Sequence, residues 1–247
     1  MLTKKVVKYI QSLTHKKFRE EEGVFVAEGP KVIAEFLLEG SIECDALYGE
    51  KYWIETNPHL INLLSSDNVT EIDAHFLERI SHLKTPNQVV GIFKKPNPEY
   101  PDVKDKISIM LDDLQDPGNM GTIIRTADWF GIENIICSEN SVDCFNQKVV
   151  QATMGSLLRI NVFYTDLISF MNKNAGIKLY ATALEGNSIY EMDKIKEAII
   201  IIGNESKGIR DELFQFSSEK INIPRIGKAE SLNAAVATGI ILAQFRK

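Results

Sequence analysis

The sequence predicts an α/β protein with two domains: a small mixed α/β domain over residues 1–95 and a larger one over residues 107–247. In the larger part, apolar stretches of strand length alternate with amphipathic stretches of helix length. This alternation is typical of a mostly parallel sheet with helices on both faces. Between the two parts, residues 96–106 place three prolines among charged residues. Because proline restricts its own backbone dihedral angles and those of the residue before it, we expect an extended linker there.

The first domain shows short alternating elements. Val32, Ile33, Phe36 and Leu37 have the spacing of an amphipathic helix, and Gly40 follows where a helix commonly ends. We expect helices at Val6–Leu13, Gly29–Glu39 and Ala74–Ile80, and strands at Val24–Ala27, Ala46–Tyr48, Val69–Ile72 and Val89–Phe93.

The second domain has a more regular pattern. We expect strands at Ile107–Leu111, Asn134–Ser138, Ile160–Phe163, Leu179–Ala183, Ile199–Ile202 and Lys220–Ile223. Helices are expected at Thr122–Phe130, Phe145–Gly155, Asp166–Asn174, Lys207–Phe216 and from Ser231 to about Phe245. The apolar run Ile199–Ile202 suits a central buried strand. In such sheets ligands bind beyond the carboxyl ends of the strands.

The composition limits the classes of function. The chain has 247 residues, a net charge of -6 and 44% hydrophobic residues, so it is not globally basic, and any contact with nucleic acid must rest on a local basic patch. Its three cysteines include no C-x-x-C pair, which argues against a disulfide framework or zinc site and favours the cytoplasm. The N-terminus lacks a signal-peptide pattern, and residues 232–245 are too short to span a membrane, so no membrane role is expected.

One segment, Leu111–Gly131, joins a strand to a helix through Pro117-Gly118-Asn119-Met120-Gly121. Glycines permit close approach of a backbone to a ligand, and we expect Thr122 to open the helix. The free N–H groups of that helix, with Arg125 beyond them, could hold a phosphate. The alternative is an ordinary turn in which Asn119 caps the helix and Arg125 lies at the surface.

Two later segments have the same design. In Ile199–Ile209, Glu205 follows an apolar strand; its carboxylate could bind loop amides or a cation, or simply cap the next helix. In Ile223–Phe245, Ser231 is the expected N-cap, and Asn233 falls in the first turn of a helix rich in small residues. A tightly packed capped helix would explain the small residues but explains Asn233 less well.

The sequence lacks the motifs or residues that several classes of enzyme use. Neither the dinucleotide fingerprint G-x-G-x-x-G nor the P-loop motif occurs. All four histidines, His15, His59, His75 and His82, precede the linker, so histidine triads and His-rich metal sites are not expected in the second domain. No metal is expected. Group transfer from an activated donor fits this residue set, because the cofactor then carries the difficult chemistry.

The three segments resemble the motifs of the SpoU (TrmH) family of RNA 2′-O-ribose methyltransferases, within the SPOUT class. The matching residues are Asn119, Gly121 and Arg125; Gly203, Asn204, Glu205 and Gly208; and Ile223, Pro224, Ser231, Leu232 and Asn233. Where the family usually has Val-Ser, this chain has Ala234-Ala235, which we expect to matter little for catalysis. The resemblance covers about residues 107–247.

The resemblance implies S-adenosylmethionine as methyl donor, a deep C-terminal trefoil knot, and a homodimer involving the last helix. The first domain is similar, more loosely, to a ribosomal-protein-like RNA-binding domain, and ribosomal RNA is favoured over transfer RNA as substrate. The implied cofactor residues are Thr182, Ala183, Leu184, Gly203, Asn204, Gly208, Ile223, Pro224, Ser231, Leu232 and Asn233; the implied RNA-binding residues are His15, Lys16, Lys17, Arg19 and Arg125.

The resemblance also implies catalytic roles. Arg125 would bind the target phosphate, and in this family the arginine is often proposed as the general base. Because arginine stays protonated in proteins, we expect it instead to stabilise the developing alkoxide. Asn119 would orient Arg125 or the ribose. Glu205 and Ser231 would shape the site, and Asn233 would hold the cofactor or the target nucleotide. The alternatives are a transfer-RNA 2′-O-methyltransferase, a catalytically inactive RNA-binding or assembly factor of the same fold, and a doubly wound enzyme for another nucleotide cofactor.

Overall fold

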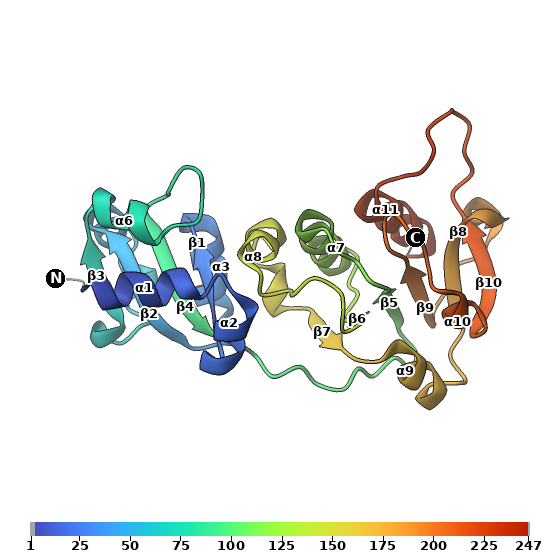
Figure 1. Ribbon diagram of the computed structural model, residues 1–247, viewed down its shortest axis with the longest axis horizontal. Helices are drawn as coiled ribbons and strands as arrows, with labels where there is room; N and C mark the ends of the chain where they lie inside the picture. Colours follow the sequence, from blue (N-terminus) through green and yellow to red (C-terminus); the bar gives the residue numbers. More distant parts are fainter. Residues whose placement is uncertain (1–2, 247) are drawn as a thin grey trace. The chain divides into compact units, whose positions relative to one another are not determined.

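The computed structural model describes residues 3–246, which form two compact units (Figure 1). The first unit contains residues 3–97 together with Phe145–Leu158, and the second contains Pro98–Cys144 together with residues 159–246. The change of unit at residues 97 and 98 falls inside the predicted linker. The segment 145–158, which the sequence pattern assigned to the second domain, belongs to the first unit. The domain boundaries 1–95 and 107–247 stay a prediction.

The first unit is built on a four-stranded sheet with the order β1-β4-β2-β3. Strand β4 (Val89–Lys94) runs antiparallel to both β1 (Val24–Glu28) and β2 (Cys44–Glu50), and β2 runs parallel to β3 (Val69–Ile72). The helices are α1 (Lys4–Ser12), α2 (Lys16–Glu22), α3 (Pro30–Glu39), α4 (Lys51–Thr56), α5 (Pro58–Ile61), α6 (Ala74–Ile80) and α8 (Gln147–Thr153), with short 3₁₀ turns η1 (Ser66–Asn68) and η2 (Ser156–Leu158).

The segment 145–158 is packed into the first unit by aromatic and close backbone contacts. The ring of Phe145 lies 4.9 Å from that of Phe25 on β1, and the ammonium of Lys95 lies 4.9 Å from the centroid of the same Phe145 ring. At Gly155 the backbone φ is +100°, and a Cβ would stand 2.7 Å from Cβ of Glu35. This segment is therefore an integral part of the first unit.

The second unit is a six-stranded, wholly parallel sheet with the order β10-β8-β9-β5-β6-β7. The predicted parallel sheet is confirmed. Its strands are β5 (Ile107–Leu111), β6 (Asn134–Cys137), β7 (Asn161–Tyr164), β8 (Leu179–Ser188), β9 (Ala198–Ile202) and β10 (Ser217–Asn222). Its helices are α7 (Pro117–Trp129), α9 (Leu167–Lys173), α10 (Asp211–Phe214) and α11 (Ala234–Phe245), with the 3₁₀ turn η3 (Ile189–Glu191).

Helices cover both faces of this sheet, as alternate residues of β8 show. Leu179 and Ala181 pack into a core cluster with Phe170 of α9 and Leu213 of α10. Tyr180 points to the opposite face, where its ring lies 6.0 Å from that of Phe245 on α11. Strand β9, between β8 and β5, is buried along its whole length, as its apolar sequence predicted.

Two helix starts differ from the prediction. Helix α7 begins at Pro117 rather than Thr122, because Oδ1 of Asp116 caps it by accepting a 2.7 Å hydrogen bond from the backbone N–H of Asn119. Helix α11 begins at Ala234, and its N-cap is Asn233, so the prediction that Ser231 is the N-cap was wrong.

Two further elements differ in length. The helix expected over residues 207–216 is reduced to the single turn of α10, and β8 continues five residues past the expected Ala183. Among the described residues, no helix is long and apolar enough to cross a membrane.

Candidate active site

The loops of all three predicted segments start from one edge of the sheet. Strands β10, β8, β9 and β5 are neighbours and run parallel, so their carboxyl ends face the same way. Asp112 follows β5, Gly203 follows β9 and Ile223 follows β10. The chain therefore brings parts more than 100 residues apart to one ligand-binding edge, as expected for a parallel sheet.

Three predicted catalytic residues are linked by hydrogen bonds. The side-chain amide of Asn119 donates to Oε1 of Glu205 at 2.9 Å, and the amide of Asn233 donates to Oδ1 of Asn119 at 2.7 Å. Oδ1 of Asn233 accepts from the backbone N–H groups of Ala235 and Val236 at 3.0 and 3.2 Å. We call this chain the Glu205–Asn119–Asn233 relay. It fixes the buried Asn119 in one orientation and joins all three segments.

The relay answers the alternatives that the sequence left open. Asn119 does not cap α7, since Asp116 does. Glu205 does not cap the next helix either, since the N-cap of α10 is Arg210. Asn233 does cap α11, but with its oxygen alone, so its amide nitrogen is free to hold Asn119.

The loop 203–208 is closed on itself. The backbones of Asn204 and Gly208 exchange hydrogen bonds of 3.0 and 2.9 Å, and Oδ1 of Asn204 accepts from the N–H groups of Ser206 and Lys207. The amide of Asn204 also donates to the backbone oxygen of Asp113 at 2.7 Å. A Cβ on Gly203 would stand 2.3 Å from the backbone carbon of Gly208, so only glycine fits at position 203.

A buried acid that the sequence analysis missed holds this loop in place. Asp112 has 0% exposure; its Oδ1 accepts from Nε of Arg210 at 2.8 Å, and its Oδ2 accepts from the backbone N–H of Arg210 at 2.9 Å. The pair fastens the end of the loop after β9 to the end of β5. The sequence signal for Asp112 is its position directly after an apolar strand. Its role could not be predicted from that signal, because its partner Arg210 lies 98 residues away in the sequence.

Arg125 and Ser231 lie outside the relay. Arg125 is exposed on α7, two turns beyond Asn119, and forms no hydrogen bond or ion pair with any residue in the described range 3–246. Ser231 is exposed in the loop before α11, and its hydroxyl likewise has no hydrogen bond within that range. A guanidinium without a protein partner is available for an anionic ligand.

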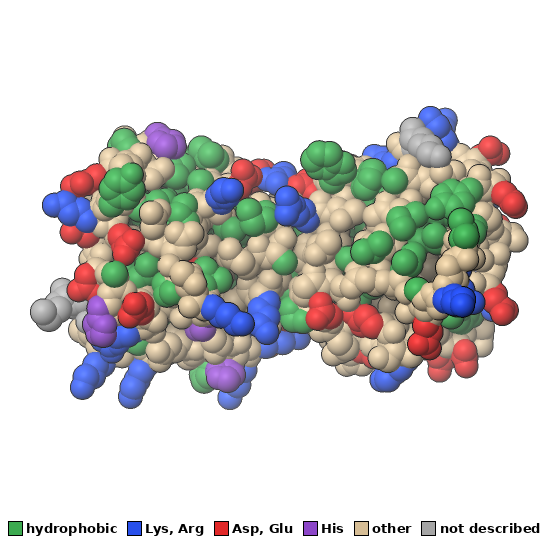
Figure 2. Space-filling model, turned by 90° about the horizontal axis from the view of Figure 1, so that it is seen from above, with side chains coloured by type: hydrophobic (Ala, Val, Ile, Leu, Met, Phe, Trp, Pro, Cys, Tyr) green, Lys and Arg blue, Asp and Glu red, His purple; other side chains and the backbone are tan. Residues whose placement is uncertain are grey.

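Two of the predicted cofactor residues outside the relay expose apolar side chains. Thr182 is tied to the sheet, since its hydroxyl donates to the backbone oxygen of Ile201 at 2.9 Å. Beside it Leu184 is 72% exposed, and Leu232 is 48% exposed in the loop before α11. Ile226, in the same loop after Ile223 and Pro224, is 102% exposed. Figure 2 shows hydrophobic side chains at the surface of the part of the second unit that carries β8 and α11.

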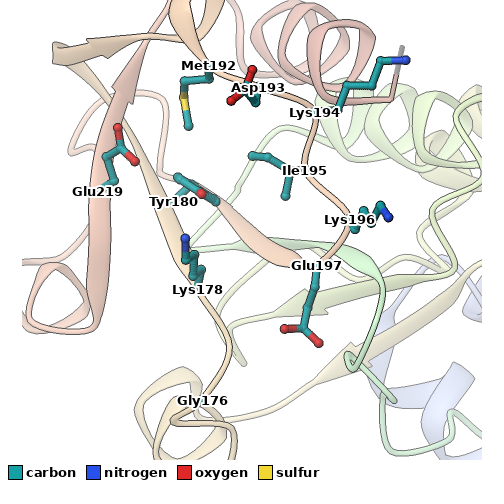
Figure 3. Close-up of a pocket in the computed structure, with 10 residues that line it drawn as sticks. All are labelled: Gly176, Lys178, Tyr180, Met192, Asp193, Lys194, Ile195, Lys196, Glu197 and Glu219. Atoms are coloured by element: carbon teal, nitrogen blue, oxygen red, sulfur yellow. The ribbon is translucent and has the colours of Figure 1, made fainter.

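A pocket of about 510 Å³ lies elsewhere on the second unit, where β8 and β9 begin (Figure 3). Tyr180, Met192 and Ile195 line it together with charged side chains of both signs, and Lys194 and Lys196 point away from Tyr180. It is not at the carboxyl edge and holds none of the predicted site residues. No group of three or more His, Cys, Asp or Glu residues within 3–246 is arranged to hold a metal ion.

The predicted RNA-binding residues of the first unit have two different environments. His15, Lys16 and Lys17 are exposed at the start of α2. Arg19 is 2% exposed, and its Nη1 donates to the backbone oxygens of Leu13 and Thr14 at 2.8 Å each. Because Arg19 satisfies carbonyls at the end of α1, it is not presented to a phosphate.

Comparison with known proteins identifies both parts of the chain. The model of the SpoU rRNA methylase family matches residues 106–243, and that of the MRM3-like substrate binding domain matches residues 4–91. The 23S rRNA (guanosine(2553)-2′-O)-methyltransferase RlmP of Bacillus subtilis is 31% identical over 97% of this chain and 95% of its own length.

Solved structures agree in fold over the whole chain. A protein of the TrmH family from Porphyromonas gingivalis superposes with a TM-score of 0.87 at 35% identity, covering 100% of this chain and 98% of its own. An AdoMet-bound rRNA methyltransferase from Sinorhizobium meliloti superposes with a TM-score of 0.86 at 33% identity, covering 100% of this chain and 95% of its own.

Proposed function

Since the chain belongs to the SpoU rRNA methylase family, we propose that it methylates a ribose 2′-hydroxyl of ribosomal RNA, with S-adenosylmethionine as methyl donor. One observation in this structure carries the proposal: the Glu205–Asn119–Asn233 relay joins all three motif segments at the carboxyl edge of the sheet.

The residues at this edge fit S-adenosylmethionine. Leu184, Ile226 and Leu232 offer exposed apolar side chains, which suit the two flat faces of an adenine ring. The exposed carboxylate of Glu205 suits an ammonium group. Bound there, S-adenosylmethionine supplies an activated methyl group on a sulfonium sulfur.

In the proposed mechanism, Arg125 acts by charge. An arginine side chain stays protonated in proteins and is therefore a poor general base. The unpaired guanidinium of Arg125 would bind the phosphate beside the target ribose and stabilise negative charge on the 2′-oxygen as its proton leaves to water. Asn119, held rigid by the relay, would orient the ribose, and Ser231 would contact the substrate or cofactor from the loop before α11.

The experiment is transfer of labelled methyl from S-adenosylmethionine to ribosomal RNA. We expect Arg125→Ala to lose at least about 100-fold in rate, typical for loss of one charge-stabilising donor, while S-adenosylhomocysteine binds as it does to the wild type. The matched control is Lys196→Ala, which removes an exposed cation at the other edge of the same sheet. Turnover of Arg125→Ala near the wild-type rate would contradict the assigned role.

The same assay, together with binding measurements for RNA and cofactor, separates the remaining alternatives. Label appearing only in transfer RNA would favour the transfer-RNA enzyme. Tight binding of ribosomal RNA without any methyl transfer or cofactor binding would favour the assembly factor. Mapping 2′-O-methyl groups in RNA from cells with and without the protein would identify the nucleotide.

The trefoil knot, the homodimer and the cytoplasmic location are further parts of the proposal. Exposed Trp129 on α7 and Val236 on α11 support an interface on these two helices. The three cysteines carry free thiols, which suits a reducing compartment. Sedimentation of the purified protein would test the dimer.

A further inference from the structure

Asn222 has a buried polar atom without a partner at the proposed cofactor site. It is the last residue of β10 and directly precedes Ile223 and Pro224, at the foot of the loop that rises between β10 and α11 in Figure 1. Within residues 3–246, only two buried side-chain polar atoms lack a hydrogen bond: Oδ1 of Asn222 and Oγ of Ser108. Native proteins keep few such atoms, because an unpaired buried acceptor is costly.

The two atoms differ in what could satisfy them. Ser108 is fully buried as the second residue of β5, near the amino end of the strand and opposite the ligand-binding edge, so no ligand at that edge reaches it. Asn222 is only half-buried and is the last residue of β10, at the ligand-binding edge and directly before the predicted cofactor residues Ile223 and Pro224.

The unpaired atom is an acceptor. The amide nitrogen of Asn222 donates to the backbone oxygen of Leu184 at 3.5 Å. Exchanging the oxygen and nitrogen positions would place two acceptors against each other at that distance, so the assigned orientation is favoured. The missing partner of Asn222 is therefore a hydrogen-bond donor.

The neighbours of Asn222 indicate the kind of donor. Leu184, whose carbonyl holds the Asn222 amide, and Ile226, four residues after Asn222, both expose apolar side chains. A nucleoside combines flat apolar faces with donors at its edge: the adenine amino group and the ribose hydroxyls.

We propose that Oδ1 of Asn222 accepts a hydrogen bond from the nucleoside part of S-adenosylmethionine, so that Asn222 is a further cofactor-binding residue. This inference rests on the proposed function. The group satisfies an atom that the unliganded fold leaves unpaired, and Asn222 thereby selects nucleosides that present a donor at this point.

The test is calorimetry with S-adenosylhomocysteine and two analogues: one in which the adenine amino group is replaced by a carbonyl oxygen, and one without the ribose hydroxyls. We expect Asn222→Ala to weaken binding of S-adenosylhomocysteine by about 3- to 10-fold, the usual value of one neutral hydrogen bond. The wild type should lose a similar factor with one analogue, and Asn222→Ala should lose little more with that same analogue. Which analogue shows this identifies the donor.

Two controls separate a ligand contact from a structural role. Asn187→Ala removes an exposed asparagine of the neighbouring β8, whose amide donates to Glu219 at 2.6 Å, and should bind S-adenosylhomocysteine as the wild type does. Without ligand, Asn222→Ala should melt within about 2 °C of the wild type, because it removes an oxygen that has no partner and only one long hydrogen bond of 3.5 Å to Leu184. Only the ligand-induced rise in Tm should shrink.

Binding by Asn222→Ala within twofold of the wild type, or additive losses with both analogues, would overturn the proposal while leaving the proposed function intact. Failure of the wild type itself to bind S-adenosylhomocysteine would overturn both.

Discussion

Replacing Asn119 with aspartate would put a second carboxyl group into the Glu205–Asn119–Asn233 relay. Asn119 donates to Oε1 of Glu205 at 2.9 Å and accepts from Asn233 at 2.7 Å. Aspartate has the same shape and keeps the acceptor, but it turns the donor into a carboxylate oxygen facing another carboxylate. The matched control is Asn119→Ala, which removes both hydrogen bonds without adding charge.

The size of each effect follows from the geometry. In Asn119→Asp the lost bond costs about 1 kcal/mol, because Glu205 is exposed and its carboxylate regains water. Repulsion between two carboxylates 3–4 Å apart adds about 1 kcal/mol at high dielectric. An acid in the first turn of α7 recovers about 0.5 kcal/mol, so the net loss at pH 8 is about 1.5 kcal/mol. Asn119→Ala loses two bonds of about 1 kcal/mol each and regains about 0.6 kcal/mol of helix propensity.

The two variants should therefore lose similar stability at pH 8 and differ at pH 5. In the aspartate variant, a proton shared between the two carboxyls restores a donor, so the folded state binds more protons than the unfolded state. Stability then falls as pH rises, and the loss at pH 5 should be about 1 kcal/mol smaller than at pH 8. Urea unfolding at both pH values measures this. If Asn119→Asp follows Asn119→Ala at both pH values, the relay geometry is refuted.

Three other variants or conditions test separate parts of the structure. Lys16→Ala and Lys17→Ala should each weaken RNA binding and lower the steepness of the plot of log K against log salt by about 1. The control is Lys51→Ala, since Lys51 is likewise exposed and paired with a glutamate four residues on, and it should leave the slope unchanged. Equal slopes in all three variants would exclude the α2 contact. Asp112→Asn should lower the free energy of urea unfolding by about 1–3 kcal/mol, because it removes the charge of the buried partner of Arg210. Lys207→Ala, at the exposed pair with Asp113, should lower it by less than about 0.5 kcal/mol. Equal losses of stability in the two variants would contradict this order. Burial raises the pKa of Cys44 to about 12 and that of Cys137 well above its usual value, so these thiols should resist alkylation at pH 8 until the protein unfolds. Folding stability should fall as the pH rises above about 9, because only the thiols of the unfolded chain ionise there. Rapid labelling of the folded protein would contradict their burial.

The strands of the second unit were predictable because their signal is local. A run such as Ile199–Ile202 has no polar side to expose, so it must lie inside the sheet whatever its neighbours are. The carboxyl ends then follow from the parallel arrangement, and with them the meeting of the three segments at one edge.

Contacts between distant residues could not be predicted in the same way. The helix expected from Lys207 is reduced to one turn, because the backbone and side chain of Arg210 are both bound to Asp112 on another strand end. Pro117 and Gly118 were interpreted as a turn, whereas Asp116 caps a helix that includes both. Arg19 looked like a surface cation because its sequence neighbours are charged, but the carbonyls at the end of α1 accept its guanidinium hydrogens.

The docking of residues 145–158 into the first unit affects the order in which the chain can fold during synthesis. Phe25 lies in β1, near the N-terminus, but Phe145, which covers it, is made only after β5, α7 and β6. Until residues 145–158 are synthesised, the first unit therefore lacks Phe145 against Phe25 and Gly155 against Glu35. Cutting the gene at the linker would make that transient state permanent, since the first unit draws residues from both sides of it.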